Sequence, residues 1–258
     1  MTQVTRSSNS RLRLEGKVAI VTGGGMGLGQ ATAMLFADEG AKVVVAEINR
    51  EAGEDTIAKI LSRGGKAFFV PTDVRRATDA ERMVTEAVGR FNRVDVLVNN
   101  VGFQINKNVV DMTEEEWDSV LDTNLKSMFL CSKYAIKQMR IQGGGNIICI
   151  SSLSGLVGNG LQASYNASKH GVIGLARCMA VDHAADHIRV NVVCPGSMNT
   201  PLTLTVPEEK LAPYRKANLL KRFAEPIEVA YTILHLASEE SSFVTGAVFV
   251  VDGGFTTV

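Results

Sequence analysis

Long hydrophobic runs, a net charge and closely spaced cysteines are all missing from this sequence. No apolar run approaches the ~20 residues needed to span a bilayer, so we expect no membrane-spanning segment. The 27 basic and 27 acidic side chains cancel one another. This balance gives no electrostatic basis for binding nucleic acid or an anionic membrane, and we expect neither as a partner.

The cysteines are few and widely spaced, with no C-x-x-C or other metal-binding spacing. We interpret them as reduced thiols of a cytoplasmic protein and expect no metal site. His183 and His187, four residues apart, are better explained as charge balance near a helix C-terminus than as metal ligands. The four cysteines are Cys131, Cys149, Cys178 and Cys194.

The first residues, 1–13, are basic and rich in serine but contain no apolar stretch, so they do not form a secretory signal. We expect a short disordered tail there. The remaining residues, 14–258, provide enough apolar material for one large domain, since 45% of the 258 residues are hydrophobic.

Seven short runs rich in β-branched residues alternate with longer stretches of helical periodicity. Continuous apolar strands separated by helices are typical of a parallel sheet covered on both faces. Without a composition break or a repeat, the pattern predicts a single doubly wound α/β domain with a seven-stranded parallel sheet, which binds ligands beyond the carboxyl ends of its strands. The expected strands are 17–22, 41–47, 66–72, 94–99, 146–151, 188–194 and 246–251.

One of the expected helices begins with a capping box, in which Thr113 is followed three residues later by Glu116. Helical spacing then places Asn124 on the apolar, inward face. Because a buried amide needs hydrogen-bond partners, Asn124 is either a structural hydrogen-bonder or part of a functional site.

The first strand leads into TGGGMGLG (22–29), which carries glycines at Gly23, Gly27 and Gly29. Glycines at these places allow a tight turn and let a pyrophosphate approach a helix N-terminus. The second strand ends in Glu47, 18 residues after Gly29. A carboxylate at about this distance is typical of a group that binds the ribose hydroxyls of a dinucleotide.

The charge of Glu47 favours NAD over NADP, because a carboxylate repels a 2′-phosphate. The loop itself supplies no compensating cation, since the residue before Gly27 is Met26. Arg50 lies three residues beyond Glu47 and is the nearby cation that we favour for a phosphate contact. Arg75 and Arg76, beside Asp73, are better interpreted as solvated than as partners of a 2′-phosphate.

Tyr165 and Lys169 lie four residues apart in YNASK (165–169), so a helix would place them on one face. An ammonium beside a phenol favours the phenolate, and we expect the pKa of Tyr165 to be lowered. Taken alone, the pair also fits a surface tyrosine and a solvated lysine.

Several separated motifs in one order resemble the short-chain dehydrogenase/reductase family, an oxidoreductase family with an NAD(P)-binding Rossmann fold. The resemblance covers residues 14–254, and Ser152 precedes Tyr165 by 13 residues, as is usual there. Two departures are small: NNVG stands where NNAG is usual, and Glu47 where Asp is commoner. The motifs are TGGGMGLG, NNVG (99–102), Asn124, Ser152, YNASK, PGSMNT (195–200) and VDGG (251–254).

The resemblance implies four catalytic residues. Tyr165 would be the general acid/base at the substrate oxygen, and Lys169 would lower its pKa and bind the nicotinamide ribose. Ser152 would donate a hydrogen bond to the same oxygen. Asn124 would hold a water that connects Lys169 to solvent. Ser151 is adjacent to Ser152, but strand alternation turns it to the opposite side, so we assign it no catalytic role.

The resemblance also implies cofactor and substrate contacts. A lid around residues 198–222 would cover the substrate. Substrate contacts would come from Ser152, Leu153, Tyr165 and Leu202. Cofactor contacts would come from Gly23, Gly27, Leu28, Gly29, Glu47, Asp73, Val74, Asn100, Val101, Gly102, Tyr165, Lys169, Pro195, Gly196, Met198 and Thr200.

The sequence therefore predicts an NAD(H)-dependent oxidoreductase that transfers hydride between nicotinamide and a neutral, fairly apolar secondary alcohol or ketone. A carrier-bound 3-oxoacyl reductase is the alternative within the class, although such enzymes usually prefer NADPH. A non-catalytic NAD-sensing or scaffold protein is an alternative of a different class. By analogy with the family we expect a homotetramer.

Overall fold

The computed structural model describes residues 12–257, and for Leu202 only the main chain. Its centre is a seven-stranded parallel sheet with the strand order β3-β2-β1-β4-β5-β6-β7. All seven expected strands are present, each within about two residues of its predicted ends. They are β1 (Val18–Thr22), β2 (Lys42–Glu47), β3 (Lys66–Pro71), β4 (Val96–Asn99), β5 (Gly145–Ile150), β6 (Ile188–Pro195) and β7 (Val248–Val251).

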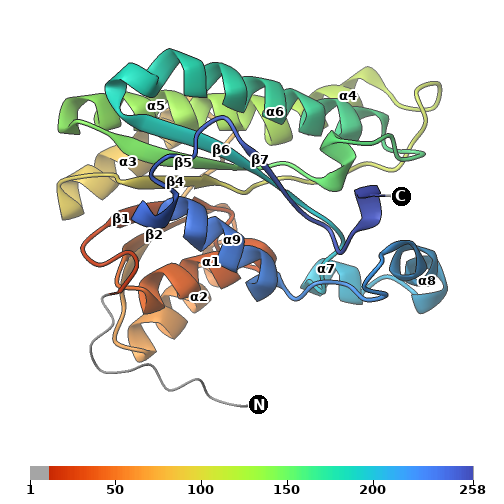
Figure 1. Cartoon of the computed structure of the whole chain (residues 1–258), viewed down its shortest axis with the longest axis horizontal. Helices are drawn as coiled ribbons and strands as arrows, with labels where there is room; N and C mark the ends of the chain where they lie inside the picture. The colour runs from red at the N-terminus through yellow and green to blue at the C-terminus, as the bar shows by residue number, and fades with distance from the viewer. Residues whose placement is uncertain (1–11, 258) are drawn as a thin grey trace.

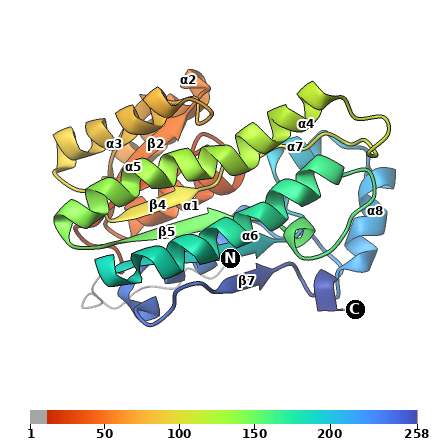
Figure 2. The same cartoon turned by 90° about the horizontal axis from the view of Figure 1, so that it is seen from above.

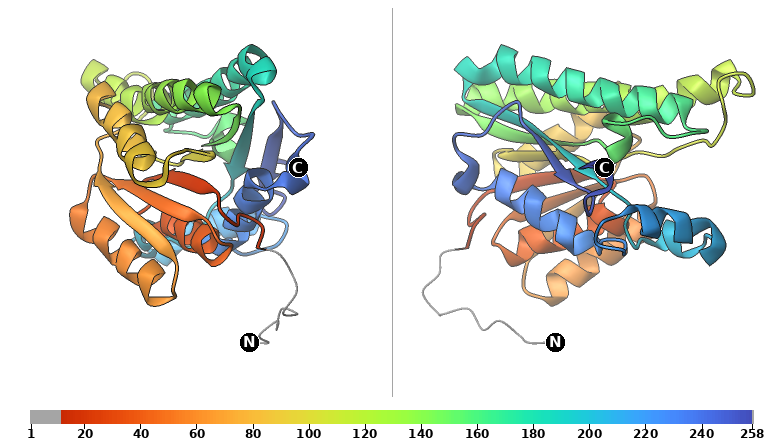
Figure 3. Two further views of the ribbon diagram at one scale, coloured as in Figure 1. Left: turned by 90° about the vertical axis from the view of Figure 1, so that its left-hand side faces the viewer. Right: turned by 45° about the vertical axis from the view of Figure 1, so that its right-hand side comes forward.

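Helices cover both faces of this sheet and give a three-layered domain (Figures 1 and 3). The predicted doubly wound α/β fold is thereby confirmed. One layer is formed by α1 (Gly27–Asp38), α2 (Arg50–Ser62) and α9 (Pro226–Ala237). The other is formed by α3 (Ala77–Phe91), α4 (Glu114–Leu121), α5 (Ser127–Gln142) and α6 (Ala163–His183).

Alternation along the strands divides the buried residues between two apolar cores. In β1, Ile20 packs in the core beneath α3, α5 and α6, whereas Ala19 and Val21 pack in the core beneath α1 and α9. All three side chains are fully buried. A strand buried on both faces carries no polar alternation, which explains the continuous apolar runs of the sequence.

The helix that begins at the predicted capping box is interrupted after two turns. Thr113 accepts from the main-chain N–H of Glu116 at 3.2 Å, and the Glu116 carboxylate accepts from the N–H of Thr113 at 3.0 Å. A π-helical turn, Asp122–Lys126, then separates α4 from α5. Asn124 lies within this turn and is fully buried. Such turns are frequent at functional sites.

The predicted lid leaves the sheet after β6 and contains α7 (Pro201–Leu204) and α8 (Glu208–Ala217). Both helices lie beyond one end of the sheet (Figure 2). A β-bridge between Met198 and Ala224 closes the base of the excursion. The lid's two ends are thus held together beside the carboxyl ends of the strands.

At the N-terminus, residues 1–11 of the predicted tail lie outside the described residues. Arg13, which we also assigned to the tail, pairs with Glu240, and its main-chain N–H donates to Glu39 Oε2 at 3.1 Å. The packed fold therefore includes Arg13, one residue before the predicted boundary. Among residues 12–257, no helix is both long and apolar enough to cross a membrane.

Candidate active site

The predicted phosphate loop connects β1 to the N-terminus of α1. The residue before α1, Met26, makes no side-chain cap, and the first turn contains no acidic residue. The free N–H groups and the positive end of the helix dipole therefore face the loop without a partner from a capping side chain. This arrangement fits the pyrophosphate of a dinucleotide.

Two of the loop glycines are required by close approach. A Cβ on Gly29 would lie 2.0 Å from the carbonyl oxygen of Gly23. Gly23 has φ +63°, and a Cβ there would lie 3.0 Å from Cγ2 of Val101. The valine of NNVG thus packs directly against the loop, and no side chain fits at either glycine.

The loop is joined to β4 through Asn100. Its side-chain amide donates to the carbonyl oxygens of Thr22, at 3.0 Å, and Gly23, at 3.3 Å. Its main-chain N–H donates to the Thr22 hydroxyl at 3.0 Å. The chain order reverses between β1 and β4, which is where doubly wound sheets bind their ligands.

Glu47 lies at the carboxyl end of β2 and is 8% exposed. Its Oε2 accepts from the N–H of Gly25 at 3.1 Å. Its Oε1 accepts from the N–H groups of Ile48, at 2.9 Å, and Asn49, at 3.0 Å. The carboxylate is therefore held beside the phosphate loop, where the sequence predicts a ribose-binding acid.

Asp73, one of the predicted cofactor contacts, lies beside Arg75. Arg75 donates to both carboxylate oxygens, at 2.9 and 2.7 Å, while about half of its side chain stays exposed to solvent. The hydrogen bond from Arg75 lowers the pKa of Asp73 below its ordinary value. Val74 beside it is buried.

On the other side of the loop, Lys169 of α6 lies against the end of β5. It is 3% exposed, and its ammonium donates to the carbonyl oxygen of Ile150 at 2.9 Å. Its Nζ lies 5.6 Å from the ring centroid of Tyr165, which is half-buried one helical turn earlier. The predicted shared face is confirmed.

Ser152 follows β5 and caps the short helix Leu153–Gly155. Its Oγ accepts from the N–H of Ser154 at 3.1 Å, which leaves the hydroxyl hydrogen free to donate. Its partner on the α6 side is Tyr165. The hydroxyl hydrogen of the neighbouring Ser151 is already used in a hydrogen bond, since it is donated to the main-chain carbonyl of Lys169 at 2.7 Å.

The pKa values of the pair differ from the sequence-based expectation. Burial raises the pKa of Tyr165, although a hydrogen bond with Ser152 opposes the shift. Burial also lowers the pKa of Lys169 to about 8. The expected lowering of the Tyr165 pKa is therefore wrong for this structure, because the low-dielectric surroundings disfavour the phenolate more than its neighbours stabilise it.

Asn124 is held by partners that the sequence could not identify. Its Oδ1 accepts from the N–H of Phe103 at 2.9 Å, and its Nδ2 donates to the Phe103 carbonyl, at 2.9 Å, and to the Ser168 hydroxyl, at 3.0 Å. The amide therefore joins the segment after β4 to α6. The water that the resemblance places at Asn124 stays a prediction.

Gly102 lies between these groups. A Cβ on Gly102 would come within 3.0 Å of the Lys169 ammonium and 3.4 Å of Asn124 Oδ1. Glycine at this position thus allows the main chain of NNVG to pack directly over Lys169.

These elements enclose a cavity of about 170 Å³. Ile150 and Ser151 line it without having been predicted, while Leu153 is buried and does not line it. Thr200 lies nearby, with its Cγ2 3.5 Å from a Cβ placed on Gly27. The side chain of Leu202 lies outside the described residues. The predicted residues that line the cavity are Leu28, Asn100, Gly102, Ser152, Tyr165, Lys169, Pro195, Gly196 and Met198.

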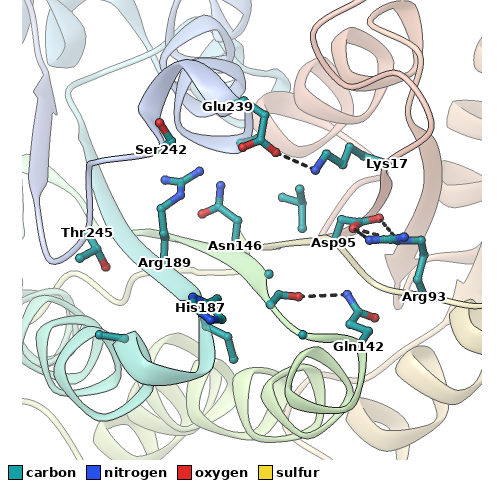
Figure 4. A pocket seen from close by; sticks show the side chains of 17 residues that line it. Lys17, Arg93, Asp95, Gln142, Asn146, His187, Arg189, Glu239, Ser242 and Thr245 are labelled. Carbon is teal, nitrogen blue, oxygen red and sulfur yellow. Dashed lines mark hydrogen bonds and ion pairs between the residues drawn. The ribbon is translucent and has the colours of Figure 1, made fainter.

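A larger cavity, of about 440 Å³, lies at the opposite, amino end of the strands (Figure 4). Its charged groups are matched within the protein. Lys17 pairs with Glu239 at 2.7 Å, and Arg93 pairs with Asp95 at 2.6 Å. The Arg189 guanidinium donates to three carbonyl oxygens, those of Leu236, Ser238 and Val244. This cavity therefore offers no comparable set of free reactive groups among the described residues.

Comparison with known proteins gives matches over nearly the whole chain. The sequence profile of the family described as enoyl-(acyl carrier protein) reductase matches residues 23–256. A 3-oxoacyl-[acyl-carrier-protein] reductase of Thermotoga maritima is 41% identical over 243 residues, covering 94% of this chain and 99% of that protein. A cyclopentanol dehydrogenase of Comamonas sp. is 41% identical over 247 residues, covering 95% and 98%.

The fold also has solved relatives. The crystal structure of a short-chain type dehydrogenase/reductase from Mycobacterium marinum superimposes with a TM-score of 0.91 at 34% sequence identity. The match covers 96% of this chain and 98% of that one.

Removing the buried ammonium should stabilise the protein in a pH-dependent way. We expect Lys169→Met to raise the free energy of unfolding at pH 7 by roughly 3 kcal/mol, since the pKa of Lys169 falls from 10.5 to about 8 on folding. Between these two pKa values only the unfolded wild type binds the proton. Wild-type stability then rises with pH, and the advantage of the variant should shrink.

Denaturant titrations from pH 7 to 10.5 measure this difference. Lys66→Met, at an exposed lysine, is the matched control and should show no such trend. An advantage of Lys169→Met that stays constant across this range would contradict the account.

Proposed function

Because the chain belongs to the short-chain dehydrogenase/reductase family, we propose that it is an NAD(H)-dependent oxidoreductase that interconverts a secondary alcohol and a ketone. The observation that carries the proposal is the cavity at the carboxyl ends of the strands. Ser152, Tyr165 and Lys169 line it together with Leu28 of the uncapped α1 N-terminus. Proton-transfer groups and a phosphate site thus meet in one place.

When bound, the nicotinamide coenzyme of this family donates or accepts the hydride. In ketone reduction, Tyr165 donates its phenolic proton to the substrate oxygen, and its raised pKa keeps that proton in place at neutral pH. Ser152 donates a second hydrogen bond to the same oxygen as charge develops there. Lys169, with a pKa of about 8, is mainly charged at pH 7 and stabilises the phenolate that remains. Alcohol oxidation uses the same groups in reverse.

The surroundings of Glu47 support NAD rather than NADP. Its buried carboxylate places negative charge beside the phosphate loop. The cation that we considered as a phosphate partner, Arg50, is engaged elsewhere. It pairs with Glu54 at 2.7 Å, and its guanidinium lies 5.4 Å from the ring centroid of Phe69. A 2′-phosphate would therefore meet the carboxylate without a free arginine at this position.

Exposed apolar side chains on the segments that border the cavity support an apolar substrate. Phe103 is 39% exposed, Leu156 38% and Leu204 77%. Cyclopentanol dehydrogenase, a relative at 41% identity, carries the name of a small cyclic secondary alcohol. We propose substrates of that kind, neutral and without a charged group.

A carrier-bound 3-oxoacyl reductase is the second candidate, because a relative of that name is also 41% identical. The negative charge of Glu47 opposes it, since such reductases usually prefer NADPH. Turnover of a 3-oxoacyl thioester with NADPH, faster than that of any free ketone with NADH, would favour this candidate.

A panel of secondary alcohols with NAD⁺ and of ketones with NADH, followed by nicotinamide absorbance, tests the reaction class. We expect turnover of neutral cyclic substrates by the wild type. Tyr165→Phe should lower kcat by at least about 100-fold, because general acid–base catalysis contributes on that scale. NADH binding, followed by fluorescence, should be retained.

Substantial turnover by Tyr165→Phe would refute the acid/base assignment. Tyr231→Phe is the matched control, because this tyrosine lies on α9 and is 55% exposed. It should leave kcat unchanged.

Cofactor preference tests Glu47 separately. We expect kcat/KM for NAD(H) to exceed that for NADP(H) by at least about tenfold, which corresponds to ~1.4 kcal/mol of discrimination. Glu47→Gln removes the charge and should narrow this ratio. Glu51→Gln, an exposed acid in the first turn of α2, should leave it unchanged. A wild-type preference for NADP(H) would overturn the interpretation of Glu47.

We also propose a homotetramer in the cytoplasm. Apolar side chains exposed at the β7 edge of the sheet and on the outer helices support association. Light scattering should give about four times the 27.7 kDa chain mass, whereas a monomer mass at micromolar concentration would contradict the proposal. The exposed side chains are Phe129 and Ile141 on α5, Val181 on α6, Phe243 in a turn that precedes β7, and Val250 on β7.

A further inference from the structure

Ser151 makes a contact with the catalytic helix that the proposed reaction does not by itself use. Its hydroxyl donates to the main-chain carbonyl oxygen of Lys169 at 2.7 Å, and both residues are 3% exposed. Lys169 lies within α6, well away from the ends of the helix. The Ser151 hydroxyl therefore acts as an additional donor from outside the helix, and it ties α6 to the end of β5.

The residues on both sides of Ser151 also contact this helix. The carbonyl oxygen of Ile150 accepts from the Lys169 ammonium at 2.9 Å, and Ser152 faces Tyr165. Three consecutive residues thus contact the side chain of Lys169, its main chain and the tyrosine one turn before it. Of these three contacts, only the hydrogen bond from Ser151 to the Lys169 main chain involves no reacting side chain.

We infer that Ser151 is a positioning residue, which sets the alignment of Lys169 and Tyr165 with Ser152 through its hydrogen bond to the Lys169 carbonyl. The inference deepens the proposed function and rests on it for its kinetic consequence. Ser151 itself contacts no reacting atom in this account.

The packing around the contact leaves it little freedom. A Cβ on Gly155 would lie 2.4 Å from the Ser151 hydroxyl oxygen and 2.8 Å from the Lys169 carbonyl oxygen. Gly155 therefore packs so closely against both atoms of the hydrogen bond that a side chain at this position would displace them. Catalytic groups lose much of their rate advantage when they move by about 1 Å. Loss of the hydrogen bond between Ser151 and the Lys169 carbonyl should therefore lower the turnover rate.

A simpler explanation is that a buried hydroxyl merely needs a partner. Ser241 provides the matched case. It is 1% exposed, and its hydroxyl donates to the carbonyl oxygens of Leu236, at 2.9 Å, and Ser238, at 3.2 Å. Its contacts lie at the end of α9, away from the candidate active site. Ser241→Ala therefore reports the cost of losing a buried hydroxyl alone.

The experiment compares Ser151→Ala, Ser151→Thr and Ser241→Ala in the full chain. Thermal midpoints give stability, kcat and KM are measured with the best substrate of the panel, and NADH binding is followed by fluorescence. The titration of Lys169 is followed by NMR of protein labelled with ¹³Cε-lysine, without substrate or coenzyme, and is assigned with Lys169→Met.

We expect Ser151→Ala to lower kcat about tenfold or more while KM and NADH binding change little. The titration of Lys169 should move from about 8 towards the 10.5 of a solvated lysine, because loosening α6 admits water to the ammonium. Ser151→Thr keeps the hydroxyl and should restore part of kcat. Ser241→Ala should lower the thermal midpoint without either effect.

The inference is overturned if Ser151→Ala keeps the wild-type kcat, or if kcat falls while Lys169 titrates as in the wild type. Should the wild type turn over no member of the panel, the proposed function fails instead. The titration of Lys169 in Ser151→Ala then decides the inference alone, and an unchanged titration refutes it.

Discussion

The candidate chemistry depends on the contact between the carboxyl end of β5 and the first two turns of α6. Ile150, Ser151 and Ser152 are consecutive, and each contacts Lys169 or Tyr165. Because β5 is a central strand between β4 and β6, it supplies a rigid reference for α6. The same edge of the sheet carries the phosphate loop after β1, so the proton-transfer groups and the phosphate site are positioned by one framework.

This arrangement places a buried charge in the fold at a cost in stability. Within residues 12–257 the Lys169 ammonium donates to one carbonyl oxygen and forms no ion pair with a carboxylate, and burial lowers its pKa to about 8. A solvated lysine would destabilise the folded protein less, but it would not titrate near neutral pH beside Tyr165. The protein thus accepts local destabilisation where chemistry takes place, as functional sites commonly do.

The sequence patterns predicted the architecture, and the family resemblance predicted most of the residues that line the cavity, but neither predicted their electrostatics. Strands such as β1 were recognisable because residues buried on both faces must all be apolar. The capping box at Thr113 depends only on residues that are close in the sequence, so the start of this helix was predictable as well. The raised pKa of Tyr165 depends on tertiary burial, and the Asp73–Arg75 pair depends on side-chain geometry. The π-helical turn around Asn124 and the hydrogen bond of Ser151 have no recognisable sequence signature.

A crystal structure of the wild-type chain with NAD⁺ tests the central claim most directly. The account predicts the pyrophosphate at the α1 N-terminus, the adenosine ribose hydroxyls on Glu47, and the nicotinamide in the cavity beside Tyr165 and Lys169. Dinucleotide density in the larger cavity at the amino ends of the strands, or a nicotinamide beyond reach of Tyr165, would contradict it.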